Sequence, residues 1–204
     1  RPVEWLFDNF DIDRNWCLIH ATHMNSTETS MMAQSGCIAG LCPTTEANLG
    51  DGFFNAVDYL AEQGGWAIGS DSHISIDPVE ELRWLEYGMR LQTRRRNVLA
   101  TTQVTNTGRN LLNGALAGGA RACGRLIGRI DEGYRADFVV LDHEHPRLYG
   151  RHADDLLDSW IFSGNDNLVR DVYVGGTKVI DNGHHINEDE IARNYRATLD
   201  QLTN

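Results

Sequence analysis

Two short apolar runs, each ending abruptly in ionisable side chains, constrain the fold of this chain more than any other feature. Residues 16–19 (WCLI) are followed directly by His20, and residues 66–68 (WAI) are followed three positions later by Asp71. Continuous short apolar runs are typical of parallel strands buried on both faces, and such strands present functional groups at their carboxyl ends. We therefore predict that His20 and Asp71 lie together at one edge of a parallel sheet and carry the function.

The rest of the amino-terminal part alternates strand-like and helix-like patterns, which is typical of repeated βα units. A third strand is predicted between the two runs, and helices follow the strands, with Pro78 starting the longest of them. The predicted strands cover residues 16–19, 37–41 and 66–68, and the predicted helices cover residues 26–34, 53–63, 79–92, 105–116 and 117–127.

The pattern changes after residue 128. Short β-branched runs separated by glycine-bearing turns predict antiparallel strands at residues 136–142, 171–176 and 178–180. An amphipathic helix over residues 188–202 closes the chain, and its apolar face is expected to pack against the rest of the protein. We therefore divide the chain into residues 1–128, 129–187 and 188–204.

Composition excludes several classes of function. The net charge of −11 argues against nucleic acid or an anionic membrane as partner, because both are bound through basic surfaces. No apolar run approaches the roughly 20 residues of a membrane span, and the first residues lack the pattern of an export signal. The four cysteines have no CxxC spacing, which favours reduced, buried thiols. We expect a cytoplasmic protein with a small-molecule substrate.

Four motifs together resemble a known family. They are HATH at residues 20–23, CPTTEANLG at 42–50, GSDSH at 69–73 and GYRADFVV at 133–140. In this order they resemble the carboxyl-terminal half of the amidohydrolase-superfamily deaminases, and most of all the branch that acts on N-formimino-L-glutamate. The first three are fairly specific for that branch, whereas the last marks only the superfamily.

The resemblance implies a (β/α)8 barrel that binds one divalent metal at the carboxyl ends of its strands. It also implies a separate small β-sandwich. In that scheme the chain contributes strands six to eight, ending at His20, at residues 41–43 and at Asp71. The metal is usually zinc, with Fe²⁺ or another divalent ion as alternatives. Asp71 would bind the metal and accept a proton from the attacking water, and His20 would hydrogen-bond that water or the tetrahedral intermediate.

The implied reaction is hydrolytic deimination of N-formimino-L-glutamate to N-formyl-L-glutamate and ammonia. The family takes further metal-binding histidines from its first and fifth strands, and no histidine precedes His20 here. We therefore expect that an amino-terminal half completes the site, that this chain alone is neither stable nor active, and that the complete protein is a homodimer. The one His-x-His, at residues 143–145, follows a strand of the second part and is expected to be a surface loop.

Two alternatives stay open. The same groups would serve an aminohydrolase acting on a purine, pterin or triazine ring, and the chain by itself could be a non-catalytic fragment.

Several other residues have competing interpretations. His23 is more simply a supporting or capping histidine. For His73, a substrate contact and a structural role both stay open. Capping of the loop, in preference to ligand contact, best explains Thr44, Thr45, Glu46 and Asn48. The arginines at 94–96 are best explained as a solvated helix end, His184 and His185 as a turn, and the glycine pair at 118–119 lacks the spacing of a phosphate loop.

Overall fold

The centre of the protein is a three-stranded parallel sheet. A computed structural model describes residues 1–203, and in it the strands β1 (Cys17–Ile19), β2 (Ile38–Leu41) and β3 (Gly65–Ile68) pair in the order β1-β2-β3. All four residues of β2 are buried, because β2 has a neighbour on each side and side chains packed on both faces. The predicted strands and the parallel arrangement are confirmed.

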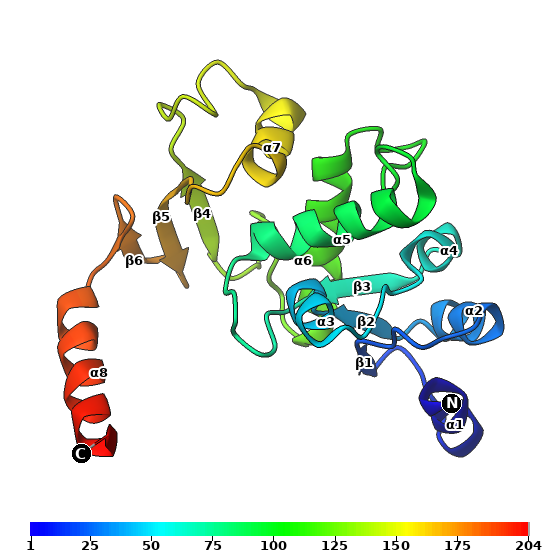
Figure 1. Ribbon diagram of the computed structural model, residues 1–204. Helices are drawn as coiled ribbons and strands as arrows, with labels where there is room; N and C mark the ends of the chain where they lie inside the picture. Colours follow the sequence, from blue (N-terminus) through cyan, green and yellow to red (C-terminus); the bar gives the residue numbers. More distant parts are fainter. Residues whose placement is uncertain (204) are drawn as a thin grey trace.

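Helices surround this sheet (Figure 1). They are α1 (Pro2–Asn9), α2 (Ser26–Ser35), α3 (Pro43–Leu49), α4 (Ala56–Ala61), α5 (Pro78–Thr93) and α6 (Thr107–Ala122). The core joins the sheet to these helices through fully buried side chains such as Met32, Tyr59, Met89 and Leu111. The sheet edge at β1 is less covered, since Ile19 is 54% exposed.

A second, antiparallel sheet follows. Its strands pair in sequence order and are β4 (Phe138–Leu141), β5 (Val169–Val174), β6 (Thr177–Asp181) and β7 (His184–His185). The segment that connects β4 to β5 contains helix α7 (Ala153–Phe162). Stacked rings of Phe138 and Tyr173, with centroids 4.5 Å apart, join neighbouring strands on one face. The predicted antiparallel layer is confirmed, whereas the predicted turn at His184 and His185 is wrong, because both residues pair with β6.

The carboxyl-terminal helix α8 (Glu188–Thr203) forms as predicted. None of its residues is buried, and Ile191 and Tyr195 are 54% and 64% exposed. Figure 1 shows α8 standing apart from the central sheet. None of the described residues buries its apolar face, so the packing of this face against the rest of the protein stays a prediction.

The structure corrects the two helices predicted at residues 105–116 and 117–127. They form one helix, α6, which runs past Gly118 without a break. A Cβ at Gly118 would lie 1.7 Å from the carbonyl oxygen of Trp66, so the missing side chain lets α6 lie directly against β3. This close approach explains why a glycine stands inside the helix, next to the boundary that the sequence predicted between residues 116 and 117. Helices α1, α3 and α7 were not predicted at all.

The four cysteines are free, and three of them are at least partly shielded. Cys37 and Cys42 are buried and Cys17 is half-buried, as predicted, whereas Cys123 is exposed. Burial, together with the nearby carboxylates of Glu46 and Asp71, raises the pKa of the Cys42 thiol to about 12. The reactive thiolate form of Cys42 is therefore scarce near neutral pH.

No helix within residues 1–203 is long and apolar enough to cross a membrane.

The contact of Gly118 with β3 predicts a contrast between neighbouring glycines. Gly118→Ala is expected to lower the free energy of unfolding by about 2 to 3 kcal/mol, because the new methyl group meets backbone. Gly119→Ala, whose Cβ meets nothing within 4 Å, is expected to be neutral or to stabilise α6 by up to about 1 kcal/mol. Urea unfolding followed by tryptophan fluorescence measures both, and equal effects would contradict the packing.

The cysteine environments predict selective alkylation. Iodoacetamide near pH 8 is expected to modify Cys123 first and to leave Cys37 and Cys42 unmodified until the protein is denatured. Mass spectrometry of tryptic peptides over time measures this order. Rapid modification of Cys42 in the folded protein would show that its surroundings are open.

Candidate functional site

The carboxyl ends of the three parallel strands meet at one edge of the sheet. His20 directly follows β1, and its backbone N–H donates to the carbonyl of Gly40 at 2.8 Å, so the pairing continues one residue past the strand. Gly69 extends β3 in the same way by donating to Leu41 at 2.9 Å. The sheet therefore places the His20 side chain and the turn bearing Asp71 on either side of the end of β2.

His20 and Asp71 face each other across this edge, as predicted. Nε2 of His20 lies 3.8 Å from Oδ2 of Asp71, which is too long for a hydrogen bond. The side chains are 33% and 45% exposed, so both remain accessible from the edge of the sheet. A metal ion or a water molecule bound by Asp71 would lie next to this imidazole nitrogen.

The backbone at the site is held in an unusual conformation. The φ angles are 66° at His20, 49° at Ala21, 51° at Asp71 and 57° at His73, all in the left-handed region. Each such residue costs on the order of 1 kcal/mol or more, and the conformation persists only where surrounding contacts impose it. Four of them, in the turns after β1 and β3, indicate that both turns are held by tertiary contacts.

The short helix α3 supplies contacts to the His20 side. Glu46 is 5% exposed, and its Oε1 accepts a hydrogen bond from the Cys42 backbone N–H at 2.8 Å and lies 3.3 Å from Nδ1 of His20. Burial raises the pKa of Glu46, and its contacts with Cys42 and His20 oppose that rise. The capping contact at residues 44–48 was predicted, but the helix and the contact with His20 were not.

The next contact on α3 holds the turn that bears Asp71. Thr45 is fully buried, and its hydroxyl donates to the carbonyl of Ser70 at 3.0 Å. The same oxygen accepts the backbone N–H of Ser72 at 3.2 Å and lies 2.8 Å from the Ser72 hydroxyl. These bonds hold the backbone on both sides of Asp71.

Helix α3 is itself anchored to α5. The carboxylate of Glu81, which is 2% exposed, accepts the backbone N–H of Thr44 at 2.9 Å and its hydroxyl at 2.6 Å. Burial raises the pKa of Glu81, and the bonds from Thr44 lower it. Three consecutive residues of α3 therefore bind α5, the Asp71 turn and His20.

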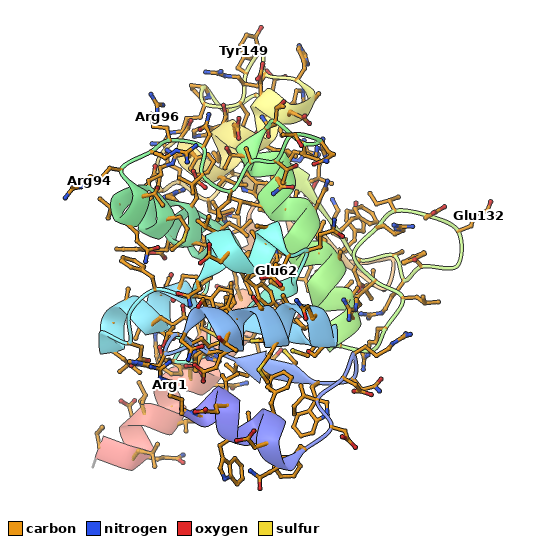
Figure 2. The ribbon with its side chains drawn as sticks, turned by 90° about the vertical axis from the view of Figure 1, so that its right-hand side faces the viewer. Arg1, Glu62, Arg94, Arg96, Glu132 and Tyr149 are labelled. Carbon is orange, nitrogen blue, oxygen red and sulfur yellow. The ribbon has the colours of Figure 1, made fainter. Side chains whose placement is uncertain are left out.

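The other sequence candidates lie outside this arrangement. His23 and His73 are exposed, and neither forms a hydrogen bond or ion pair with His20 or Asp71 within residues 1–203. His143 follows β4 in the second sheet, is exposed and pairs with Glu144 at 2.8 Å, consistent with a surface loop. Arg94 and Arg96 point away from the protein at the end of α5, as predicted for a solvated helix end (Figure 2).

Asp71 is the residue of this site that could hold a metal ion. The Asp71 carboxylate is accessible and offers oxygen, a ligand type that zinc accepts. No group of three or more histidine, cysteine, aspartate or glutamate side chains in residues 1–203 could hold a metal ion. Asp71 therefore fits one position of a metal site whose other ligands would come from outside this chain.

Comparison with known proteins gives the family. The model of the Amidohydrolase family matches residues 3–179. Formimidoylglutamate deiminase of Pseudomonas aeruginosa is 50% identical over 202 residues, which cover 99% of this chain and 45% of that protein. A 5-methylthioadenosine/S-adenosylhomocysteine deaminase of Natronomonas pharaonis is 26% identical over 89% of this chain and 41% of its own length. The chain thus spans about half the length of the curated relatives it matches.

Solved structures agree in fold. An amidohydrolase from Brucella melitensis superposes with a TM-score of 0.92 at 50% identity, covering 100% of this chain and 45% of that one. An adenosine deaminase from Xanthomonas campestris with bound zinc superposes with a TM-score of 0.85 at 23% identity, covering 100% and 46%. With the match of the family model over most of its residues, the chain belongs to the amidohydrolase family.

Proposed function

We propose that this chain is the carboxyl-terminal part of a zinc-dependent deiminase that hydrolyses N-formimino-L-glutamate to N-formyl-L-glutamate and ammonia. The observation that carries the proposal is the approach of His20 Nε2 to the Asp71 carboxylate at the end of parallel strands. The choice of substrate is supported by the 50% identity to the Pseudomonas aeruginosa deiminase over nearly the whole chain.

In the complete protein, β1, β2 and β3 would be strands six, seven and eight of a (β/α)8 barrel. Residues 1–128 would form this barrel part, residues 129–187 part of a small β-sandwich, and residues 188–204 a carboxyl-terminal helix. The 45% share of the Brucella melitensis structure that this chain covers supports a missing portion of comparable size. The cytoplasmic location and the homodimer stay predictions.

Asp71 would hold the zinc ion through its carboxylate, with histidines from the remaining portion as the other ligands. Bound zinc lowers the pKa of a coordinated water from about 15.7 toward 7, which supplies the nucleophile near neutral pH. Fe²⁺ or another divalent ion is the alternative in the same place.

The residues of this chain would then act on the attacking water and on the departing ammonia. His20 Nε2 hydrogen-bonds the water and orients it, and the Asp71 carboxylate accepts its proton. The oxygen adds to the formimino carbon, and the terminal nitrogen receives both protons of the water, the first through Asp71 and the second from the added hydroxyl as the formyl C=O forms. The bond from the carbon to that nitrogen then breaks, and the nitrogen leaves as ammonia. One water is consumed, and the formyl group stays on the glutamate nitrogen.

A purine aminohydrolase is the second candidate. It is favoured by the 26% identity to the Natronomonas pharaonis deaminase, which covers 89% of this chain. Zinc-bound deaminase structures at 23% identity or less show the shared fold only. His20 and Asp71 would serve both reactions, so they do not distinguish the two candidates. The substrate would be selected by other contacts in the complete protein.

The proposal is tested by ammonia release from N-formimino-L-glutamate, adenosine and 5-methylthioadenosine. The assay compares this chain alone with the complete protein, with zinc determined on the same samples. We expect one zinc and turnover of N-formimino-L-glutamate in the complete protein only. Turnover of a purine instead would favour the second candidate, and a complete protein with neither zinc nor turnover would contradict both.

Replacing the two site residues in the complete protein is expected to have different effects. Asp71→Asn removes the proton acceptor and weakens a metal ligand, so both zinc content and turnover should fall, turnover by about 10³-fold or more. His20→Ala should keep zinc and lower kcat by about 10² to 10³-fold.

The control is Asp8→Asn, which changes an exposed aspartate on α1 and should leave zinc content and kcat unchanged. Zinc determination by mass spectrometry and steady-state kinetics measure these effects. Full activity in both site variants would contradict the site assignment.

A further inference from the structure

The buried carboxylate of Glu46 has no part in the reaction described above, yet it contacts one of the two residues that do. We infer that Glu46 is a positioning residue that fixes the orientation and tautomer of His20, so that Nε2 presents a lone pair toward Asp71. This inference deepens the proposed function and rests on it for its catalytic consequence. The tautomer itself can be tested independently of any activity.

The two imidazole nitrogens of His20 have separate neighbours. Nδ1 lies 3.3 Å from Oε1 of Glu46, and Nε2 lies 3.8 Å from Oδ2 of Asp71. A neutral imidazole has one N–H donor and one lone pair, and the hydrogen bond at one nitrogen decides which form the other takes. A contact at Nδ1 with an oxygen that only accepts therefore leaves the lone pair on Nε2.

Oε1 of Glu46 behaves as an acceptor for a reason independent of its charge. The backbone N–H of Cys42 donates to this same oxygen at 2.8 Å. A proton on the carboxyl group is therefore favoured on Oε2, because the carbonyl-type oxygen is the better acceptor for the Cys42 N–H, and Oε1 then still accepts from His20. The geometry favours N–H on Nδ1 whether Glu46 is ionised or neutral.

The position of Glu46 is rigid enough for this role. Its helix begins with Pro43 and is tied to α5 through Thr44 and Glu81, and to the Asp71 turn through Thr45. Burial disfavours the charged form of this carboxylate, and the contacts with Cys42 and His20 oppose that effect.

The consequence for the reaction is the direction of one hydrogen bond. With the lone pair on Nε2, His20 accepts a hydrogen bond from the attacking water. The other tautomer would present an N–H there and turn the water's lone pair toward the imidazole. In the serine protease triad, a carboxylate that sets a histidine tautomer contributes about 10⁴-fold in kcat.

The direct test is ¹⁵N NMR of the complete protein labelled at its histidine imidazoles, at a pH about two units above the ordinary histidine pKa of roughly 6.5. The His20 signals are identified by their loss in His20→Asn. We expect the protonated nitrogen of His20 to be Nδ1. In Glu46→Leu, which removes the acceptor, we expect the two tautomers to mix or Nε2–H to dominate.

Three variants separate positioning from a general structural role. Glu46→Gln keeps a carbonyl oxygen that can accept from both Cys42 and His20, so it should preserve the tautomer and most of kcat. Glu46→Leu should lower kcat by about 10²-fold or more, with zinc content and KM little changed. Glu28→Gln is the matched control, because it changes another buried carboxylate, on α2, whose bonds go to Arg1, Glu4 and Asn25 and not to α3 or His20, and it should preserve the tautomer.

A double-mutant cycle completes the test. If Glu46 acts through His20, then Glu46→Leu should have no further effect on kcat in the His20→Ala background. Additive losses, or Nε2–H in the unmodified protein, would overturn the inference. Absence of deiminase activity together with Nδ1–H on His20 would contradict the proposed function and leave the positioning intact, so the two failures are distinguishable.

Discussion

The parallel pairing of β1 and β3 on either side of β2 is the constraint on which the site depends. Because all three strands run in one direction, His20, Cys42 and Asp71 leave the sheet at the same edge, although they are far apart in the sequence. The strand pairing extends to His20 and Gly69 through backbone hydrogen bonds to the central strand. Side chains from two separate βα units are thereby placed within 3.8 Å of each other.

The sheet alone does not hold the two side chains in position. Both turns adopt left-handed backbone conformations that L-residues avoid, and their stabilisation comes from the neighbouring helix α3. That helix is fixed in turn by the Glu81 carboxylate from α5. A packed core on both faces of β2 supports this assembly. The local strain at His20 and Asp71 is therefore maintained with the help of a short helix that has three separate anchors.

The sequence predicted the elements whose signals are local. The apolar runs before His20 and Asp71 identified β1 and β3, and the two side chains lie near each other as predicted, while their functional roles stay a prediction. Helix α3 was not predicted, because Pro43, Thr44 and Thr45 give it neither apolar periodicity nor high helix propensity. Its stability depends on a contact with Glu81, which lies 37 residues after Thr44. A local sequence pattern cannot predict a contact over that separation. The burial of Glu46 and its contact with His20 were not predicted for the same reason.

The predictions for α6 and β7 failed for other reasons. The sequence analysis divided the single helix α6 between residues 116 and 117, whereas Gly118 lets the helix continue in contact with the backbone of Trp66. The amphipathic pattern of α8 identified the helix correctly, but a pattern gives no information on which surface covers it. The second sheet was predicted by its β-branched runs and glycine turns, while its two-residue final strand β7 was too short to leave a signal.

The central claim is that His20 and Asp71 converge on one metal-bound reaction centre, with Glu46 behind the imidazole. A crystal structure of the complete protein with zinc, with the metal located by its anomalous scattering, tests this most directly. We expect an Asp71 oxygen about 2.0 to 2.2 Å from the zinc, His20 Nε2 directed to the open coordination position, and Glu46 still on Nδ1. Zinc at another site, such as His143 and His145, with Asp71 unbound, would contradict the account.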